Sequence, residues 1–318
     1  MMRTSTYRLS AEFLAESCGG RLLMGQGLIA EGGASIDSRT VRAGEAFFAI
    51  KGPRFDGHDF LETAVASGAV GLVVNEDRHE DAVRIAQTAT GRVFVVCVPD
   101  TQSALVAAAS AWVNVLMPTI VGITGSVGKS TTKDLARAVC ATRFETHATA
   151  GNFNNRLGFS LTCLKLLPLH EVMVAEMGMN APGEIAELCR IARPNVGLVT
   201  CVAPVHLEGL KTLDAVASAK AEMIQALPDD GYALLNLDDP RVAAMHTQTR
   251  AQTIGFGRAQ GADVRLVDVA LDADGRAIVS VDVAGHLVTT HLSLIGAHQA
   301  MNAVAAFAIG HAIGAEPE

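Results

Sequence analysis

Hydrophobic and polar positions follow two different patterns along this chain, and the change between them divides it into two parts. Over about the first 115 residues, short apolar runs alternate with alanine-rich stretches. From residue 119 onward, continuous runs of Val, Ile and Leu are separated by helical patterns, which is typical of a parallel sheet covered on both faces. We therefore predict an α/β protein with a small N-terminal α/β domain over residues 1–116. Residues 117–318 are predicted to form a mostly parallel sheet domain with helices on both faces.

The same patterns predict individual elements. In the first part, strands are expected over residues 46–50, 70–75 and 92–98, and helices over 60–67 and 101–116. In the second part, strands are expected over 119–124, 172–176, 196–202 and 232–237, and helices over 129–142, 182–193, 213–227 and 298–313. Residues 263–294 alternate between apolar and polar positions around D-A-D-G, which predicts antiparallel strands at a sheet edge.

Composition and charge narrow the class of protein. Apolar residues make up 49% of the chain and charged residues 18%, as in soluble globular proteins. The net charge of −8 and the lack of a basic tract argue against nucleic acid or an anionic membrane as the main partner. The six cysteines are scattered singly, without a C-x-x-C pair, which predicts buried, reduced thiols. The N-terminus lacks an apolar signal region, and the longest apolar stretches, 104–113 and 303–314, are shorter than a membrane span. We expect a cytoplasmic protein.

A glycine-rich segment, G-S-V-G-K-S at residues 125–130, lies between a predicted buried strand and a predicted helix. Glycines let the backbone turn tightly, so several N–H groups can point at phosphate oxygens at the start of the helix. In such a loop Lys129 would reach the β- and γ-phosphates and the hydroxyl of Ser130 would bind Mg²⁺. The general pattern also requires glycine at position 123, where this chain has Ile123. The segment therefore predicts a P-loop-type ATP site that departs from the general pattern.

The surrounding sequence resembles one particular family. Residues 122–133, G-I-T-G-S-V-G-K-S-T-T-K, resemble the ATP loop of the Mur ligases, which place their glycines in this way. Residues 149–158, T-A-G-N-F-N-N-R-L-G, are similar to the T-x-G-N-x-N-N-x-x-G segment of the branch that adds D-alanyl-D-alanine. Further matches follow in family order at residues 37–39, 47–52, 56–58, 176–178, 183–185, 206–208, 219–222, 236–239 and 296–302.

The resemblance implies a catalytic and metal-binding set. It implies that Glu176 and His206 hold a second Mg²⁺, and that Lys220 is carbamylated by CO₂ and becomes an anionic magnesium ligand. Glu176 also ends a strand of the predicted parallel sheet, where ligands bind and where a carboxylate near phosphates suits Mg²⁺. From the residues alone, Glu176 is equally a solvated strand-end carboxylate, His206 a surface loop histidine and Lys220 an exposed helical lysine. The implied catalytic residues are Lys129, Glu176, His206 and Lys220, and the implied metal ligands are Ser130, Glu176, His206 and Lys220.

Nucleotide contacts are implied for the loop and for two later segments. Residues 296–302 resemble the family's G-x-H-N-x-x-N, which lies near the adenine, but Gln299 replaces the usual Asn. We therefore carry over only His298 and Asn302 from that segment. The implied ATP-binding residues are Thr124, Gly125, Ser126, Val127, Gly128, Lys129, Ser130, Thr131, Asn236, His298 and Asn302.

Substrate contacts are implied on both sides of the loop. The first domain resembles a UDP-substrate-binding domain, and the asparagine cluster at 152–155 is implied to lie beside the peptide part of the substrate. A plain polar turn is the alternative for that cluster. The implied substrate-binding residues are Ser38, Arg39, Lys51, Gly52, Asp56, His58, Asn152, Asn154 and Asn155.

The implied activity is an ATP-dependent ligation in cytoplasmic peptidoglycan precursor synthesis. D-Alanyl-D-alanine would be joined to UDP-N-acetylmuramoyl-tripeptide through an acyl-phosphate intermediate. The family's C-terminal Rossmann-like domain is expected to be absent from this chain, which predicts poor ligation by the chain as it stands. Two alternatives remain: a sister ligase that adds the third amino acid, and an inactive nucleotide-binding module. We expect a monomer.

Overall fold

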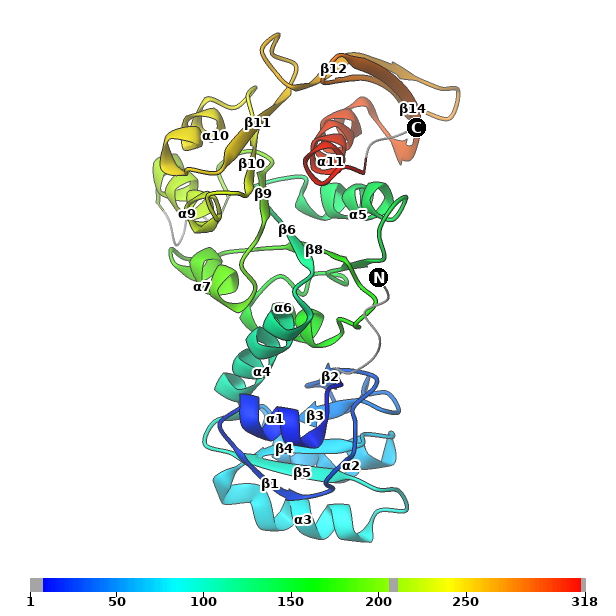
Figure 1. Ribbon diagram of the computed structural model, residues 1–318, viewed down its shortest axis with the longest axis vertical. Coiled ribbons are helices and arrows are strands. Elements are labelled where there is room, and N and C mark those ends of the chain that lie inside the picture. Colours follow the sequence, from blue (N-terminus) through cyan, green and yellow to red (C-terminus); the bar gives the residue numbers. More distant parts are fainter. Residues whose placement is uncertain (1–7, 206–210, 316–318) are drawn as a thin grey trace. The chain divides into compact units, whose positions relative to one another are not determined.

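The computed structural model describes residues 8–205 and 211–315 (Figure 1). The chain divides into two compact units, and the division is not a single cut. The first unit comprises Met1–Met117 and Ser160–Leu169, and the second comprises Pro118–Phe159 and His170–Glu318. Within the described residues, no helix is both long and apolar enough to cross a membrane.

The first unit is built on one twisted sheet. Its strands are β1 (Arg21–Met24), β2 (Ala34–Ser35), β3 (Ala46–Phe48), β4 (Gly71–Asn75) and β5 (Phe94–Val98). Its helices are α1 (Ala11–Ser17), η1 (Gly57–Phe60), α2 (Leu61–Ala66), η2 (Glu76–Arg78), α3 (His79–Thr88) and α4 (Thr101–Leu116). The strand order is β1-β5-β4-β3-β2, with only β1 antiparallel to its neighbour among the described strands. Phe47, Leu72 and Val95 pack with apolar side chains of α2 and α3, so this sheet face is fully buried.

The second unit contains a larger sheet. Its strands are β6 (Thr119–Thr124), β7 (Thr146–Ala148), β8 (Val172–Glu176), β9 (Val196–Val199), β10 (Tyr232–Asn236), β11 (Gln252–Gly257), β12 (Val264–Leu271), β13 (Arg276–Val283) and β14 (His286–Ile295). The helices of this half of the chain are α5 (Lys129–Cys140), α6 (Arg156–Leu164), α7 (Glu184–Ile191), α9 (Leu213–Ala226), α10 (Pro240–Ala243), η3 (Ala244–Gln248), η4 (Ala297–Gln299) and α11 (Ala300–Ile313). The order is β14-β13-β12-β11-β10-β9-β6-β8-β7.

The pairing of the central strands brings functional positions to one edge of this sheet. From β7 to β12 neighbouring strands are parallel. In this register Ile123 lies opposite Glu176, and Thr124 lies opposite Val199. The carboxyl ends of β6, β8 and β9 therefore meet at the same edge, which is where ligands bind in open α/β sheets.

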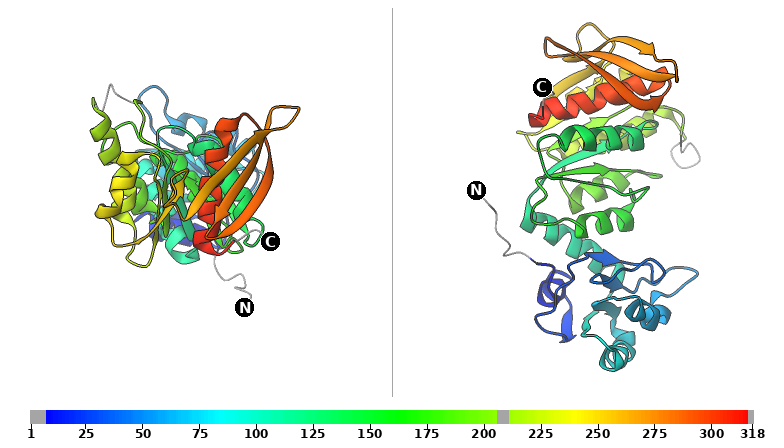
Figure 2. Two further views of the ribbon diagram at one scale, coloured as in Figure 1. Left: turned by 90° about the horizontal axis from the view of Figure 1, so that it is seen from above. Right: turned by 90° about the vertical axis from the view of Figure 1, so that its right-hand side faces the viewer.

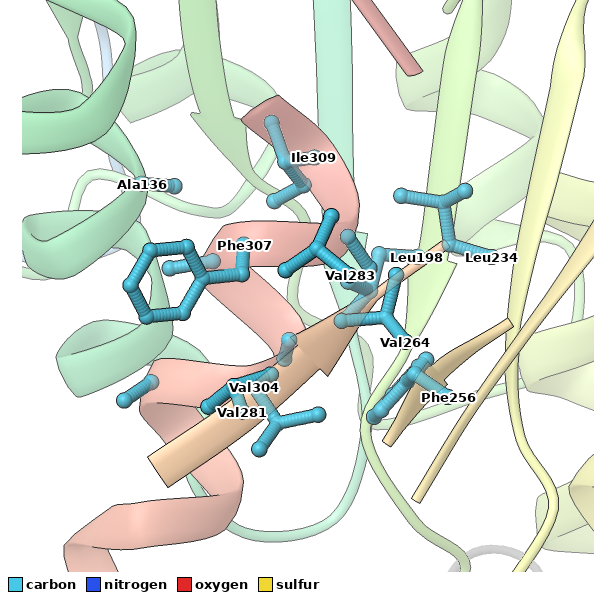
Figure 3. Packing of buried hydrophobic residues seen from close by; sticks show 14 of the residues in the cluster. Ala136, Leu198, Leu234, Phe256, Val264, Val281, Val283, Val304, Phe307 and Ile309 are labelled. Carbon is cyan, nitrogen blue, oxygen red and sulfur yellow. The ribbon is translucent and has the colours of Figure 1, made fainter. Parts of the chain in front are cut away.

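Helices cover both faces of the central strands. On β10, Leu234 belongs to a core shared with α5 and α11, whereas its neighbours Ala233 and Leu235 belong to a core shared with α9 and α10. Successive side chains of a strand point to opposite faces, so a strand buried on both sides must be apolar throughout. Figure 3 shows side chains of α5, α11 and the strands gathered in the first of these cores.

The last three strands form an antiparallel ribbon that curves over α11 (Figure 2). Val279, Val281 and Val283 of β13 alternate with less buried residues and point into the same core as α11. Helix α11 also packs against α5, and nearly all of its residues are apolar. A helix that is apolar on every side must be covered on every side, and this one lies between the ribbon and α5.

The predicted fold class, the mostly parallel second sheet and the antiparallel edge ribbon are confirmed. Two predicted strands extend too far, because β3 ends at Phe48 and β9 ends at Val199. Residues 200–202 leave the sheet and bond the phosphate loop, as described below. The helices α1, α3, α6 and α10 and the strands β1, β2, β7 and β11 were not predicted.

Candidate functional site

The loop between β6 and α5 has a backbone that only glycine suits at two positions. Gly125 has φ +146° and Gly128 has φ +88°, both in the region that side chains rarely adopt. A Cβ on Gly125 would lie 1.8 Å from Thr200 Oγ1, and one on Gly128 would lie 2.5 Å from Asn302 Oδ1. The loop is therefore shaped by both its own glycines and its neighbours, and α5 begins directly after it at Lys129.

The segment that follows β9 holds this loop in place. Ser126 Oγ donates to Ala203 O (3.1 Å) and accepts from Ala203 N (2.9 Å), while Ser126 N donates to Cys201 O (2.9 Å). Thr200 Oγ1 donates to Val127 O at 2.6 Å. These bonds explain why residues 200–202 leave the sheet. They also give both the side chain and the backbone N–H of Ser126 partners inside the protein. That Ser126 contacts a nucleotide stays a prediction.

Asn236, predicted as a nucleotide contact, also belongs to this support. Its Nδ2 donates to Thr200 O (2.8 Å), and its Oδ1 accepts from Asp238 N (3.0 Å). Asp239 Oδ2 accepts from Val202 N at 2.7 Å. The N-L-D-D motif thus holds the segment after β9, which in turn holds the phosphate loop. That Asn236 contacts a nucleotide stays a prediction.

A cavity of about 440 Å³ opens beside the loop. Lys129 lies at its edge, with Nζ donating to Gly125 O at 2.9 Å. The cavity brings together the predicted loop residues Lys129 and Ser130, the predicted metal ligand Glu176 and the asparagine cluster. Its lining residues are Gly128, Lys129, Ser130, Thr131, Asn152, Asn154, Asn155, Glu176, Gly178, Met179, Asn180 and Glu184.

Glu176 is a buried carboxylate with one unused oxygen. Its Oε1 accepts from Asn154 Nδ2 at 2.7 Å, and its backbone N donates to Thr149 Oγ1 at 3.1 Å. Its Oε2 is buried and has no hydrogen-bond partner among residues 8–205 and 211–315, and the same holds for Thr124 Oγ1 at the end of β6. Unpaired buried polar atoms are rare and costly. The solvated-carboxylate alternative for Glu176 is therefore wrong, and its free oxygen is suited to a cation.

The asparagine cluster is more than a polar turn. Asn154 bonds Glu176 through its side chain and accepts from Gly178 N through its backbone O at 3.0 Å. Asn155 Oδ1 accepts from Gly158 N at 2.9 Å, in the first turn of α6. Asn152 is exposed on the cavity rim. Thr149, the first residue of the family segment 149–158, was not among the predicted site residues, although its hydroxyl accepts a hydrogen bond from the Glu176 backbone N–H.

Lys220 lies inside the protein, not on its surface. It is 2% exposed, so the exposed-lysine alternative is wrong. Burial, and secondarily the positive charge of Lys129, lower the pKa of Lys220 to about 8. Within the described part of the chain, its ammonium has no hydrogen bond or ion pair. His206, the remaining predicted catalytic residue, lies outside the described residues.

A row of hydrogen-bonded polar side chains at the start of α11 lies beside the phosphate loop. Asn302 Nδ2 donates to Gln299 Oε1 (2.8 Å), and Gln299 Nε2 lies 3.0 Å from His298 Nε2. Thr132 Oγ1 donates to Asn302 Oδ1 at 3.3 Å, one turn into α5. Gln299, which was not carried over from the family pattern, thus joins the predicted residues His298 and Asn302. Its contact could have been predicted, because glutamine has the same amide group as the asparagine that it replaces.

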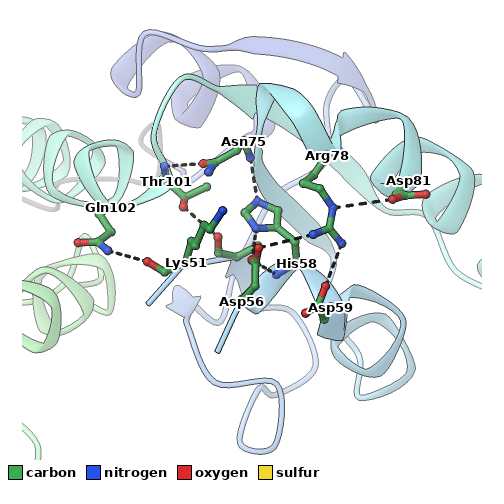
Figure 4. A network of polar contacts seen from close by, with 10 residues as sticks. Lys51, Asp56, His58, Asp59, Asn75, Arg78, Asp81, Thr101 and Gln102 are labelled. Atoms are coloured by element: carbon green, nitrogen blue, oxygen red, sulfur yellow. Dashed lines mark hydrogen bonds and ion pairs between the residues drawn. The ribbon is translucent and has the colours of Figure 1, made fainter. Parts of the chain in front are cut away.

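In the first unit, the predicted residue His58 has an internal role (Figure 4). Its side chain is 1% exposed, with Nδ1 2.6 Å from Asp56 Oδ1 and Nε2 accepting from Asn75 N at 3.0 Å. Both ring nitrogens have partners inside the protein, so His58 supports the local fold of the first unit. That His58 binds a substrate stays a prediction. Burial raises the pKa of Asp56, but hydrogen bonds from His58 and the charge of Arg78 outweigh it and hold the pKa below its usual value. The network anchors the loop that carries Lys51.

The other predicted residues of the first unit differ in exposure. Lys51 and Gly52 lie on an exposed turn in which Gly52 N donates to Phe55 O at 2.9 Å. Arg39 is exposed and pairs with Asp37 at 2.6 Å, and its hydrogen bond lowers the pKa of that carboxyl. Ser38, between them, is buried. Arg39 and Lys51 are therefore the cations of this set that face solvent.

The oxygen ligands at the cavity suit Mg²⁺, an ion that also takes ligands from water and substrate phosphates, better than a metal ion that is bound by protein side chains alone. Among residues 8–205 and 211–315, no cluster of three or more His, Cys, Asp or Glu is placed to hold a metal. Mg²⁺ is usually bound by one or two carboxylates together with water and substrate phosphates. Ser130 and the unpaired oxygen of Glu176, beside a phosphate loop, match that requirement.

Cys201 contacts the phosphate loop, since its Sγ lies 3.8 Å from Val127 O. Cys97, Cys140, Cys163 and Cys189 are buried, Cys18 and Cys201 are partly exposed, and all six are free thiols. Burial raises the pKa of Cys140 to about 12. Since the thiolate is the reactive form, a thiol such as that of Cys140 is inert. The prediction of free thiols is confirmed, and that of burial holds for four of the six.

A buried parallel sheet with a phosphate loop and a strand-end carboxylate defines a nucleotide-using α/β enzyme domain, and comparison with known proteins identifies which one. The family model for the Mur ligase middle domain matches residues 123–310, and that for the Mur ligase family, catalytic domain, matches residues 32–117. The chain belongs to the Mur ligase family.

Two curated relatives of this chain carry one and the same name. The UDP-N-acetylmuramoyl-tripeptide–D-alanyl-D-alanine ligase of Bacillus subtilis is 34% identical over 286 residues, which cover 90% of this chain and 60% of the relative. The ligase of the same name from Escherichia coli is 33% identical, with 88% and 60% covered. The chain thus spans about 60% of the length of these curated relatives.

Solved structures agree. MurF from Acinetobacter baumannii superposes with a TM-score of 0.81 at 26% identity, covering 98% of this chain and 66% of that one. MurF ligase from Thermotoga maritima in complex with ADP gives a TM-score of 0.72 at 30% identity, covering 92% and 65%.

Proposed function

We propose that this chain is the nucleotide-binding and carboxylate-activating part of an ATP-dependent ligase that joins D-alanyl-D-alanine to UDP-N-acetylmuramoyl-tripeptide. One observation carries the proposal. One cavity is lined by the phosphate loop, by the asparagine cluster and by Glu176, whose Oε2 has no partner among the described residues. The names of the curated relatives supply the two substrates.

The loop is the proposed site of the ATP phosphates. Its glycines expose backbone N–H groups at the start of α5, where the helix dipole also favours negative charge. Lys129, half-buried at the cavity edge, adds the cation that neutralises charge on the transferred group. His298, Gln299 and Asn302 are proposed to lie on the nucleoside side. ADP in the related Thermotoga maritima structure supports this assignment.

Ser130 and Glu176 are the proposed holders of Mg²⁺, with His206 as a further ligand. The ion would supply charge neutralisation on the phosphates. Glu176 is kept in place for this task from two sides, by Asn154 at its side chain and by Thr149 at its backbone.

Lys220 is proposed to carry a carbamate. A buried ammonium without a partner is costly, and the cost falls if the amine becomes neutral or is converted into an anion with a cation partner. In the neutral form the Nζ lone pair attacks the carbon of CO₂, an N–C bond forms and one proton leaves to solvent. The product is an anion suited to a magnesium ion. The lowered pKa of Lys220 provides the neutral amine near pH 8.

The proposed reaction has two steps. The tripeptide carboxylate attacks the γ-phosphorus of ATP, the bond to the β,γ-bridging oxygen breaks, and an acyl phosphate and ADP form. The amine of D-alanyl-D-alanine then attacks the acyl carbon, a proton is lost, and phosphate leaves from a tetrahedral intermediate. The chain's own contribution is positioning together with fixed charge, as in other phosphoryl transfers.

The first unit is proposed to bind the UDP part of the substrate. Arg39 and Lys51 are exposed cations that suit its diphosphate. ATP and UDP-linked sugars are cytoplasmic, so we place the activity in the cytoplasm, and we propose a monomer.

Phosphate release from ATP tests the proposal. The chain is mixed with UDP-N-acetylmuramoyl-tripeptide, with and without D-alanyl-D-alanine, and compared with Lys129→Ala. We expect dipeptide-dependent release that falls by about 10²–10³-fold in Lys129→Ala. Arg250→Ala, which removes a cation that is 86% exposed, is the matched control and should behave as the unaltered chain.

Other outcomes separate the alternatives. Release that depends on a free diamino acid and not on the dipeptide, with the UDP-dipeptide as acceptor, would identify the sister ligase. ATP binding without any substrate-dependent release would identify a nucleotide-binding module and overturn the proposal.

A further inference from the structure

Two sequence motifs that lie far apart in the chain meet in one contact. Gly183 belongs to G-E-I at residues 183–185, and Glu222 belongs to A-K-A-E at residues 219–222. Glu222 Oε1 accepts from Gly183 N at 2.7 Å, and Oε2 accepts from Ala186 N at 3.0 Å. Each carboxylate oxygen of Glu222 therefore bonds one backbone N–H at the start of α7.

Helix α7 depends on this contact because it has no cap of its own. Its N-cap is Gly183, which has φ +88° and no side chain to accept a hydrogen bond. The first N–H groups of a helix lack partners within the helix, and a carboxylate near them is favoured by the dipole as well. A residue of α9 thus does what a capping Ser or Asp would normally do within α7.

The contact joins two parts of the candidate site. Lys220, buried on α9, lies two residues before Glu222. On the other side, residues 178–184 form a wall of the cavity through Gly178, Met179, Asn180 and Glu184. Glu184 lies between the two amides that Glu222 holds, and its Oε2 accepts from Asn180 N at 2.6 Å. Removing the Glu222 carboxylate would therefore break both of these hydrogen bonds between the start of α7 and the helix that carries Lys220.

We propose that Glu222 is a positioning residue for the reaction: by bonding Gly183 and Ala186 it fixes the cavity wall 178–184 relative to the helix of Lys220. The proposal rests on the proposed function. It differs from a capping role alone, because a cap affects only the stability of α7, whereas a positioning residue also affects the chemical step.

The variants are chosen to separate these roles. Glu222→Ala removes both acceptors, and Glu222→Gln keeps one acceptor but turns an amide N–H₂ toward the other backbone donor. Glu187→Gln is the matched control, since it removes a carboxylate in the first turn of α7 that is 39% exposed and pairs with Arg156. Hydrogen exchange of the Gly183 and Ala186 amides reports whether the wall is released in each variant.

The rate of phosphate release with both substrates, measured beside the Kd for ADP, then tests positioning. A displacement of about 1 Å in an active site can slow chemistry about 10²-fold, so we expect kcat of Glu222→Ala to fall by about that factor. Glu222→Gln should fall between Glu222→Ala and the unaltered chain. The Kd for ADP should change less than about twofold, because the contact lies outside the phosphate loop. Faster exchange in Glu222→Ala with an unchanged kcat would overturn the proposal.

A second readout keeps the two proposals distinguishable. If the unaltered chain shows no substrate-dependent release, the proposed function fails, and Glu222 is judged by the ¹³C signal of a Lys220 carbamate formed from labelled bicarbonate. That signal should weaken in Glu222→Ala and persist in Glu187→Gln. An equal signal in both variants, or no signal in the unaltered chain, would overturn the positioning role.

Discussion

Asn154 Nδ2 donates a 2.7 Å hydrogen bond to Oε1 of Glu176, while Oε2 of the same buried carboxylate has no partner among the residues that the structure describes. The amide thereby fixes the orientation of the carboxylate. Asn154 follows the phosphate-loop helix in sequence, and Glu176 ends the strand next to β6. A single bond thus connects the asparagine cluster to the carboxylate that we propose as a holder of Mg²⁺.

Removing this bond should destabilise the second unit. In Asn154→Ala both oxygens of Glu176 lack protein partners, and leaving a buried polar group unpaired costs roughly 1–3 kcal/mol. Millimolar Mg²⁺ should restore part of the loss, because the cation satisfies the carboxylate. Urea denaturation with and without Mg²⁺ measures both effects. Asn152→Ala, at an exposed position in the same segment, should be nearly neutral. An equal loss in both variants would contradict the special role of Asn154.

The phosphate loop should not tolerate a side chain at Gly125. The residue has φ +146°, and a Cβ would lie 1.8 Å from Thr200 Oγ1. Backbone strain alone costs roughly 1–3 kcal/mol, so we expect Gly125→Ala to weaken ADP binding at least about tenfold. Gly261→Ala is the control, since its Cβ would meet nothing within 4 Å. Calorimetric titration with ADP measures the difference, and equal affinities would show that the loop adapts.

Elements whose structure depends on nearby residues could be predicted from the local sequence. The loop 125–130 and the strand and helix on either side of it follow from glycine spacing and from apolar runs, and the structure has them at nearly the predicted bounds. Helix α3 could also have been predicted, because its apolar residues Ala82, Val83, Ile85 and Ala86 have helical spacing. Strand β7 was not, since three residues are too few for a periodic signal.

Contacts between distant residues could not be predicted from the pattern. The bonds between Ser126 and Ala203 join residues 77 apart, and those of Glu222 to α7 span 36 and 39 residues. Nothing in their local sequence marks them. The internal contacts of His58 are a further example. It stands in a family motif and was predicted to bind the substrate, and the structure adds its burial and two internal partners, which the motif does not reveal.

The internal contacts of His58 and the exposure of Arg39 predict different effects of substitution on stability and on substrate binding. His58→Phe leaves Asp56 and the Asn75 N–H without their partner and should destabilise the first unit by roughly 1–3 kcal/mol. Arg39→Ala removes an exposed side chain and should change stability by less than about 0.5 kcal/mol, yet weaken binding of the UDP-substrate. Thermal unfolding and calorimetric titration with the UDP-substrate give both quantities. Stability that is unaffected in His58→Phe would contradict the structural role of these contacts.

Lys220 makes stability depend on pH in a defined direction. Its pKa is 10.5 in the unfolded chain and about 8 in the folded protein, a difference of roughly 3 kcal/mol. The unfolded state therefore binds more protons between these values, and the contribution of Lys220 to the free energy of unfolding rises with pH over that window. Below pH 8 the cost of burying the Lys220 ammonium lowers the free energy of unfolding by its full amount.

In CO₂-free buffer, Lys220→Met should be more stable than the unaltered chain at pH 7 and should lose this advantage as pH approaches 10.5. Urea denaturation at several pH values measures the difference. Bicarbonate with Mg²⁺ should stabilise only the unaltered chain, and a difference that stays constant from pH 7 to 10.5 would show that Lys220 is not a buried, partnerless cation.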